Sequence, residues 1–297
     1  MVRQSAQEQP SGAQVEREFD LSDEEFEHIR RLLKERSGID VNEGKRVLVY
    51  GRLARRIRAL KLRNFAEYLE LVDDRNSDES TQFLNALTTN VTDLFREEHH
   101  FELLREQIIP QLKAASSNRL RIWSAGCSAG DEPYSIALTL ARIPELKNWD
   151  VRILATDIDS DILEQAKSGI YTIERIDKLR SEYRGYFQRG IGKNEGNARV
   201  NGELRSLITF KQLNLQADWP MNGPFDVIFC RNVMIYFDTA TRERLVRRFS
   251  SLLRVNGYLF LGHSESPSAS SVRGLKSCGR TAFKKLEAGA NADVARL

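Results

Sequence analysis

The stretch "SAGCSAGDEPYS", Ser124–Ser135, decides the fold of the C-terminal part of this 297-residue chain. It follows the apolar run Leu120–Trp123 and leads into a second apolar segment, Ile136–Leu140. A loop of small residues between a strand and a helix is typical of the crevice in which an open α/β sheet binds a nucleotide, at the carboxyl ends of its strands. The stretch therefore predicts a parallel sheet with a nucleotide-like ligand at its edge.

Short apolar runs alternate with amphipathic segments from this point on. Strands buried on both faces have continuous apolar sequences, and helical crossovers between them favour a parallel sheet covered on both sides. We therefore expect residues 119–286 to form a doubly wound, Rossmann-like α/β domain. The apolar runs are Leu120–Trp123, Val151–Ala155, Ile208–Leu213, Phe225–Cys230, Tyr258–Leu261 and Thr281–Phe283.

The interval between the second and third runs is longer than one crossover helix requires. It contains Asn201-Gly202, the two-residue signal of a tight β-hairpin turn, between short strand-like sequences. We expect a small antiparallel insertion over about residues 171–207, with a hairpin turn at Asn201-Gly202.

The N-terminal part has a helical pattern and, before residue 115, no strand pattern. Ser22 and Glu25 have the spacing of a capping box, and Gly38 is expected to end the helix that they begin. Further helices are predicted by Val49, Leu53, Ile57 and Leu60, by residues 65–72 and by residues 83–87. We expect a helical domain over residues 20–90, a connector over 91–118, and disordered tails at 1–19 and 287–297.

Composition excludes several classes of protein. No apolar run approaches 18 residues, so we expect no membrane insertion and a cytoplasmic location. Three widely spaced cysteines give neither a disulfide framework nor a zinc pattern. His99 and His100 are adjacent and are expected to point apart on a helix, so no metal site is predicted.

We call the loop within Ser124–Ser135 the opening loop. The two acids at its end limit which class of ligand it can bind. The loop lacks G-x-G-x-x-G and the Gly-Lys-Ser/Thr ending of a P-loop, and it has Asp131 and Glu132 where a phosphate would bind. Two carboxylates would repel a phosphate but attract S-adenosylmethionine, which carries a sulfonium and an ammonium. The alternative is that these acids only stabilise the start of the helix through its dipole.

Polar residues at the ends of two further runs extend this site. Asp157 follows the second run, where a carboxylate can accept hydrogen bonds from ribose hydroxyls, as it also does in NAD-binding domains. Arg231 and Asn232 follow the fourth run, and such polar groups at the end of a buried strand need partners. For Arg231, an internal salt bridge is the alternative to a ligand contact.

Three stretches together resemble the CheR-type chemotaxis receptor methyltransferases: "TTNVTDLFREEHHF" (Thr88–Phe101), "RIWSAGCSAGDEPYSIA" (Arg121–Ala137) and "FDVIFCRNVMIYF" (Phe225–Phe237). The resemblance extends from about residue 20 to 285. It implies methyl transfer from S-adenosylmethionine to glutamate side chains of chemoreceptors. It also implies an inserted hairpin that, in some members, binds the C-terminal peptide of a receptor by strand addition; here Gly190–Gly196 corresponds to it.

The resemblance also implies roles for individual residues. Arg96 and Tyr236 correspond to positions at the reaction centre. At Asp131 the family commonly has a glutamate, so this contact departs from the pattern. The implied cofactor-binding residues are Asn90, Thr92, Arg96, Ala125, Asp131, Asp157, Ile158, Asn214, Leu215, Arg231 and Asn232.

The second helix is strongly basic. Arg52, Arg55, Arg56 and Arg63 are expected on one face, where they would bind an acidic receptor helix. A nucleic-acid surface is disfavoured because the helix has no cluster of aromatic residues for base stacking. We expect a monomer that binds chemoreceptors and no nucleic acid.

Three other functions would use part of the same site. A methyltransferase for RNA or a small molecule would share the cofactor crevice, a non-catalytic scaffold would bind the cofactor without turnover, and an NAD dehydrogenase is disfavoured by the acidic loop. A glutamate nucleophile has a pKa near 4.3 and is already ionised at neutral pH, so the absence of a His-Asp pair is compatible with methyl transfer.

Overall fold

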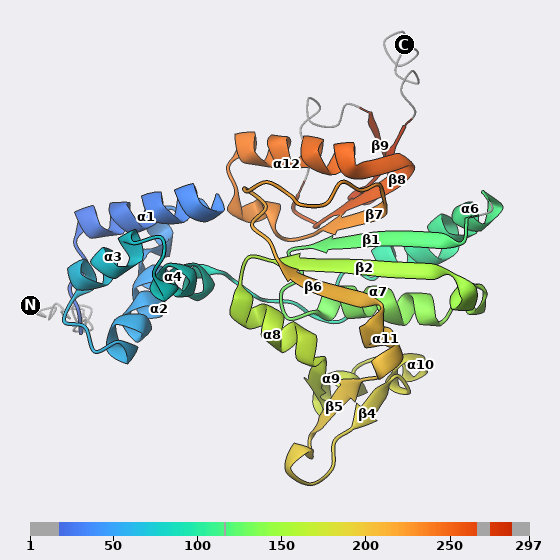
Figure 1. Cartoon of the computed structure of the whole chain (residues 1–297), viewed down its shortest axis with the longest axis horizontal. Helices are drawn as coiled ribbons and strands as arrows, with labels where there is room; N and C mark the ends of the chain where they lie inside the picture. The colour runs from blue at the N-terminus through green and yellow to red at the C-terminus, as the bar shows by residue number, and fades with distance from the viewer. Residues whose placement is uncertain (1–17, 116, 266–273, 287–297) are drawn as a thin grey trace, which may run out of the picture.

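The computed structural model describes residues 18–115, 117–265 and 274–286. Four N-terminal helices lie beside a larger part built on a central sheet (Figure 1). We call the four helices the helical lobe and residues 119–286 the sheet lobe. The helices are α1 (Asp23–Ser37), α2 (Arg46–Ala59), α3 (Phe65–Asp73) and α4 (Asp78–Leu87), with a 3-10 turn at Glu43–Lys45 before α2. The predicted tails lie outside the described residues, except for residues 18 and 19.

The ends of α1 are as predicted. The Ser22 hydroxyl accepts the Glu25 N–H at 3.1 Å, the Glu25 carboxylate accepts the Ser22 N–H at 2.8 Å, and Gly38 caps the helix in the left-handed conformation. The predicted apolar stripe of α2 is wrong at one position: Leu60 lies beyond the helix end and is 38% exposed. The helical lobe has its own core, which includes Phe26, Ile29, Leu33, Val49, Leu53, Ile57, Phe65 and Phe83.

The central sheet has the order β6-β2-β1-β7-β8-β10-β9. Its first five strands are parallel, and β10 and β9 are antiparallel additions at one edge. The predicted doubly wound sheet is confirmed, although β9 was missed because this edge strand is mostly exposed and lacks an apolar run. The strands are β1 (Arg119–Ala125), β2 (Asp150–Asp157), β6 (Ile208–Gln212), β7 (Phe225–Cys230), β8 (Leu253–Leu261), β9 (Leu275–Gly279) and β10 (Ala282–Lys285).

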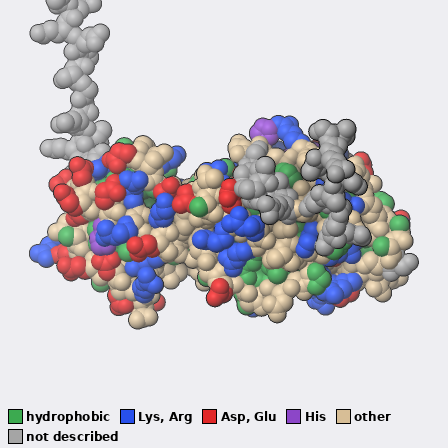
Figure 2. Space-filling view, turned by 90° about the horizontal axis from the view of Figure 1, so that it is seen from above, with side chains coloured by type: hydrophobic (Ala, Val, Ile, Leu, Met, Phe, Trp, Pro, Cys, Tyr) green, Lys and Arg blue, Asp and Glu red, His purple; other side chains and the backbone are tan. Residues whose placement is uncertain are grey.

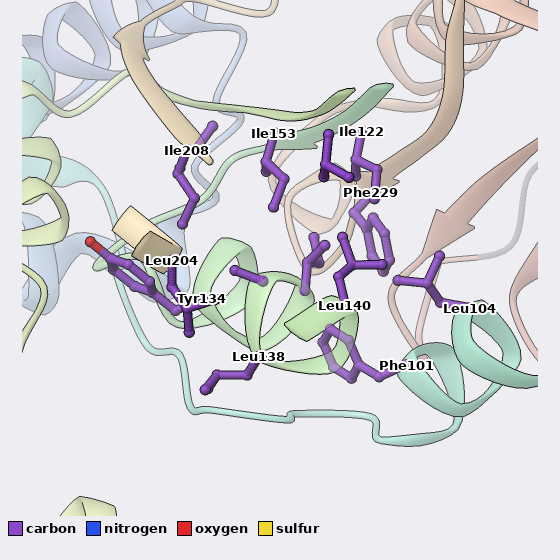
Figure 3. Close-up of a cluster of buried hydrophobic side chains, with 14 of the residues drawn as sticks. Phe101, Leu104, Ile122, Tyr134, Leu138, Leu140, Ile153, Leu204, Ile208 and Phe229 are labelled. Carbon is purple, nitrogen blue, oxygen red and sulfur yellow. The ribbon is translucent and has the colours of Figure 1, made fainter. Parts of the chain in front are cut away.

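Helices cover both faces of this sheet (Figure 1). On one face, Phe101 and Leu104 from the connector pack with Ile122 and Phe229 from the sheet (Figure 3). On the other face, Phe249 of α12 contacts Trp123, with ring centroids 5.2 Å apart. The helices are α5 (His99–Leu103), a π-helical turn (Leu104–Ile108), α6 (Ile109–Ala114), α7 (Asp131–Ala141), α8 (Ser160–Ser168) and α12 (Thr239–Leu252), with 3-10 turns at Pro144–Asn148 and Met234–Tyr236.

The predicted antiparallel insertion is present as a three-stranded sheet of order β3-β5-β4. The hairpin turn is misplaced in the prediction: Asn201 instead caps a short helix, and its side chain accepts the Leu204 N–H at 3.0 Å. Asparagine favours helix N-caps as well as tight turns, so the dipeptide alone was ambiguous. The elements are β3 (Ile170–Thr172), α9 (Ile173–Asp177), α10 (Ser181–Arg184), β4 (Phe187–Arg189), a 3-10 turn (Gly192–Asn194), β5 (Asn197–Val200) and α11 (Gly202–Ser206).

The end of α1 joins the helical lobe to the loops of the sheet lobe. The Asp40 N–H donates to the Tyr236 carbonyl at 2.8 Å, and the Asn214 side chain donates to the Arg36 carbonyl at 2.5 Å. Ile39 packs against the cores of both lobes. These contacts place the helical lobe against the carboxyl edge of the sheet. Along the described part of the chain, every helix is too short or too polar to cross a bilayer.

Candidate functional site

A cavity of about 410 Å³ lies between the two lobes at the carboxyl ends of the parallel strands. This is the volume of a typical small-molecule site, and it is the place where open α/β sheets bind ligands. Its wall contains most of the predicted cofactor residues, together with Tyr236 of the predicted reaction centre. Those cofactor residues are Asn90, Thr92, Arg96, Asp157, Ile158, Asn214, Leu215, Arg231 and Asn232.

The opening loop is held against the tip of the neighbouring strand. The N–H groups of Gly126 and Cys127 both donate to the Thr156 carbonyl, at 2.8 and 2.9 Å. Gly126 has φ of 83°, and a Cβ on it would lie 2.3 Å from a methyl of Val233. The residue must therefore be glycine for two reasons, its left-handed backbone and the close approach of the loop that follows β7.

Asp157 presents a buried carboxylate at the tip of β2. It accepts the Ser128 N–H at 2.8 Å and the Asp159 N–H at 3.1 Å, and burial raises its pKa although these donors oppose the shift. Each carboxylate oxygen keeps lone pairs for further donors. Asn90 lies beside it and donates to Asp159 at 2.7 Å. The wall is therefore rich in acceptors at the position expected for ribose hydroxyls.

Arg231 forms the internal salt bridge that was the alternative interpretation, and it also lines the cavity. Its guanidinium lies 3.2 Å from Glu132 and 3.4 Å from Glu97, with only 3% of its side chain exposed. Burial raises the pKa of Glu132, against the opposing effects of Arg231 and the Ser124 hydroxyl. Burial also acts to raise the pKa of Glu97, but Arg231 and the His263 N–H outweigh it and the pKa is lowered.

Glu97 was not predicted. Glu132 was predicted, with Asp131, to repel phosphate and attract a cationic cofactor, but it was not among the predicted cofactor-binding residues. The signal for Glu97 was its place directly after Arg96 in the run "FREEHHF" of the resembling stretch. Its Oε1 accepts the His263 N–H at 3.1 Å, and the Asn232 side chain lies 3.4 Å from the same oxygen. Glu97 therefore connects the connector to both loops at this edge of the sheet.

The predicted cofactor contacts of Asp131 and Ala125 are not supported by the geometry. Asp131 is fully buried, pairs with Arg175 of the insertion, and is not among the residues that line the cavity. Burial raises its pKa to about 6, although Arg175 opposes the shift. Ala125 lies in the apolar core. Adjacent residues on a helix point about 100° apart, so Glu132 faces the cavity while Asp131 faces the insertion.

The two predicted reaction-centre residues lie in the same wall. Arg96 is exposed and donates to the Val91 carbonyl at 3.0 Å, which folds this segment around its guanidinium. Tyr236 is half-buried in the 3-10 turn after β7, and its carbonyl is held by Asp40 of the helical lobe.

Asn214 and Leu215 contribute to the joint between the lobes. The Asn214 amide donates to the Arg36 carbonyl and its oxygen accepts the Gln216 N–H at 2.9 Å, so both ends of the side chain are already bonded within the protein. Leu215 is buried and lines the cavity.

The predicted basic face is not one free surface. Arg52 donates to the Thr88 carbonyl at 2.5 Å, and Arg56 pairs with the buried Glu79 at 2.6 Å. Arg63 lies beyond the end of α2 and pairs with its neighbour in α3, Glu67, whereas Arg55 is exposed. Figure 2 shows acidic and basic side chains mixed over the face of the helical lobe that it presents.

The prediction that His99 and His100 point apart is wrong. Their rings tilt together with centroids 4.1 Å apart, because they stand at the first turn of α5 after Glu97, whose φ is 57°. Glu97, His99 and His100 have ligand atoms within 4.8 Å of one another, the one such group in the part of the chain that the structure describes. The Arg231 guanidinium beside Glu97 is a cation that opposes a metal ion there.

Two family models match consecutive parts of the chain. Residues 24–88 match the CheR methyltransferase, all-alpha domain, and residues 90–282 match the CheR methyltransferase, SAM binding domain. The chain belongs to the CheR methyltransferase family.

Relatives of this CheR-family chain align over most of both sequences. It is 47% identical over 261 residues to Chemotaxis protein methyltransferase 2 of Pseudomonas aeruginosa, covering 86% of this chain and 91% of the relative. It is 44% identical over 273 residues to the chemotaxis protein methyltransferase of Salmonella typhimurium, covering 91% and 93%. The chemotaxis protein methyltransferase of Escherichia coli is 46% identical over 249 residues, covering 83% and 85%.

S-adenosylmethionine is the cofactor of this family's sheet domain, and the cavity fits it. Glu132, Asp157 and Arg231 all line the cavity. Glu97 is not among the lining residues, but it is the second carboxylate that pairs with Arg231. Carboxylates therefore outnumber the one buried guanidinium. Such a surface attracts a ligand that carries positive charge and repels phosphate esters.

Proposed function

We propose that this protein transfers a methyl group from S-adenosylmethionine to glutamate side chains of chemoreceptors, giving glutamate methyl esters. The observation that carries the proposal is the excess of carboxylates around the buried Arg231 at a cavity on the carboxyl edge of the sheet. The names of the relatives, chemotaxis protein methyltransferases, support the choice of receptor.

Asp157 would accept hydrogen bonds from the ribose hydroxyls, and Glu132 would face the ammonium group of the cofactor. S-adenosylmethionine supplies a methyl carbon made electrophilic by its sulfonium. The remaining wall would be provided by Asn90, Thr92, Arg96, Ile158, Asn214, Leu215, Arg231 and Asn232.

The chain itself contributes positioning rather than acid-base chemistry. A substrate glutamate is ionised at neutral pH and needs no general base. Arg96 is exposed at the cavity and would direct the incoming carboxylate by a charge-assisted hydrogen bond, while the Tyr236 hydroxyl would orient it. Correct placement of two reactants can supply most of the rate increase of such a displacement.

Exposed apolar side chains favour a protein substrate over a small molecule. Leu48, Val91 and Ile235 line the cavity but are 41%, 76% and 47% exposed. Apolar side chains gathered in one exposed place commonly mark a protein interface. Arg55 and Arg52 on the neighbouring helix α2 would then face the acidic receptor. The recognition domain would comprise residues 20–90, the connector 91–118 and the methyltransferase domain 119–286.

The insertion is proposed to bind the C-terminal peptide of a receptor. β4 is an edge strand of the small sheet, and the turn that follows it, Gly190–Gly196, contains Ile191 with 86% of its surface exposed. An edge strand offers backbone groups to an added strand. Titration of receptor tail peptides onto the protein, which we expect to be a monomer, tests this. Ile191→Asp is the variant and Val255→Asp, also exposed, is the control.

The function is tested with labelled S-adenosylmethionine, receptor-containing membranes and, separately, RNA. We expect label in the receptor band, released as methanol by mild base because the product is an ester. Asp157→Asn should lower the incorporation. Label in RNA, or base-stable label in any acceptor, would contradict the proposal and favour the RNA or small-molecule alternative.

A further inference from the structure

Glu265 is a buried carboxylate that lies behind the cavity wall rather than in it. Only 4% of its surface is exposed, and it follows the end of β8. Its Oε2 accepts the N–H groups of Asn232 at 2.9 Å and Gly262 at 2.5 Å, and its Oε1 accepts the Ile235 N–H at 3.2 Å. Three backbone donors from the ends of two strands therefore converge on one side chain.

The charge of Glu265 is satisfied by these donors. Within residues 18–115, 117–265 and 274–286, no lysine or arginine forms an ion pair with it. Burial raises its pKa, and the N–H groups of Gly262, Asn232, Met234 and Ile235 oppose the shift. A buried carboxylate that accepts several backbone donors makes strong, directional hydrogen bonds.

The donors belong to the segment that carries the proposed site. Asn232 has φ of 58°, in the left-handed region that is uncommon for residues other than glycine, although asparagine adopts it more readily than most. The bond from its N–H to Glu265 is one of the contacts that hold this conformation. The second donor from this segment, Ile235, immediately precedes Tyr236. Glu265 thus holds both ends of the turn between Arg231 and Tyr236.

The close approach of the strand end to this turn requires Gly262. A Cβ at that position would lie 2.5 Å from the Asn232 nitrogen and 2.7 Å from the Glu265 Oε2. No larger residue fits between the carboxylate and the turn. The contact is therefore built into the backbone of both segments.

We propose that Glu265 is a positioning residue for methyl transfer: by holding the Asn232 and Ile235 N–H groups, it places Asn232 against the cofactor and Tyr236 beside the substrate carboxylate. This inference rests on the proposed function of the cavity. It adds a residue that touches neither cofactor nor substrate.

The test is Glu265→Gln, which keeps the size of the side chain but replaces one acceptor oxygen by a donor. At least one N–H of the turn then faces an NH₂ group. We expect kcat to fall about tenfold or more and the affinity for S-adenosylhomocysteine, measured by calorimetry, to fall several-fold. Hydrogen exchange of residues 231–237, followed by mass spectrometry, should become faster.

Asp226→Asn is the matched control. Asp226 is also buried, lies at the opposite end of the same strand β7, accepts the Arg121 N–H at 2.6 Å and pairs with Arg254 at 3.0 Å. Its loss should lower the melting temperature but leave kcat and cofactor affinity within about twofold, because the bonds it makes are remote from the turn. Exchange of residues 231–237 should not change.

Three outcomes would overturn the inference: unchanged kcat and affinity in Glu265→Gln, unchanged exchange of the turn, or an equal loss of activity in Asp226→Asn. If Glu265→Gln does not fold, Glu265→Asp replaces it, and the same kcat, affinity and exchange measurements apply. A wild-type protein that binds S-adenosylhomocysteine but methylates no receptor would instead refute the proposed function. The binding and exchange measurements would then still decide the role of Glu265.

Discussion

The Arg231 guanidinium lies 3.2 Å from the Glu132 carboxylate, where the end of β7 meets the first turn of α7. Glu97 approaches the same guanidinium at 3.4 Å. One buried cation is therefore shared by two carboxylates, and the uncompensated negative charge is available to a cationic ligand.

Glu132→Gln should weaken the binding of S-adenosylmethionine by about tenfold. A hydrogen bond to a charged group contributes about 1.5–3 kcal/mol, and 1.4 kcal/mol corresponds to a factor of ten. Calorimetry measures the change, with Glu164→Gln on the exposed side of α8 as the control. Unchanged affinity would mean that Arg231 neutralises the Glu132 carboxylate completely, so that Glu132 does not attract the cofactor.

Gly126→Ala should destabilise the fold by about 1–3 kcal/mol and abolish tight cofactor binding, because the new methyl would meet Val233 and φ is 83°. Gly51→Ala is the control: it lies inside α2 with nothing within 4 Å of a new Cβ, and it should stabilise the protein by about 0.5–1 kcal/mol. Urea denaturation measures both. A neutral Gly126→Ala would show that the loop can move away from Val233.

The pKa of Asp131 gives a pH dependence of stability. Burial raises it from 3.8 to about 6, so between these values the folded state binds more protons than the unfolded state. The free energy of unfolding must then fall as pH rises through this window, by about 3 kcal/mol in total. The stability difference between Asp131→Asn and the wild type should therefore grow in favour of the variant from pH 4.5 to 7. A constant difference would mean that Arg175 cancels the effect of burial.

Substitutions of Arg55 and Arg56 test receptor recognition and fold stability separately. Arg56→Ala removes the partner of Glu79, which is 8% exposed and also accepts the Tyr68 hydroxyl, and should cost about 2 kcal/mol of unfolding free energy. Arg55→Ala should leave stability within about 0.5 kcal/mol but raise the KM for receptor, more at low salt than at high salt. If Arg55→Ala left that KM unchanged, α2 would not recruit the receptor by charge.

Arg96→Ala and Tyr236→Phe test the proposed reaction centre. Arg96→Ala should lower kcat/KM for receptor at least tenfold, and Tyr236→Phe should lower kcat with little change in cofactor affinity. Arg105→Ala, in the connector, is the control for the loss of a partly exposed arginine. Near-normal turnover and affinity in Arg96→Ala would remove Arg96 from the reaction centre.

Much of the architecture was predictable from local sequence patterns. The capping box at Ser22, the left-handed cap at Gly38 and six of the seven strands of the central sheet were predictable, because each depends on neighbours in the sequence. The turn at Asn201-Gly202 was misjudged for the same reason, since a dipeptide cannot tell a helix cap from a hairpin. β9 carries too few buried residues to give a pattern.

The sequence by itself determined a parallel sheet behind a helical lobe, and a loop whose acids exclude phosphate. Only the tertiary structure decided which acid faces the cavity. Asp131 and Glu132 are adjacent in the chain, but the turn of α7 directs one to Arg175 and the other to Arg231, from segments more than 40 residues away. Glu265 likewise acquires its position only when two strand ends meet, because charge pairing and backbone donors act through space rather than along the sequence.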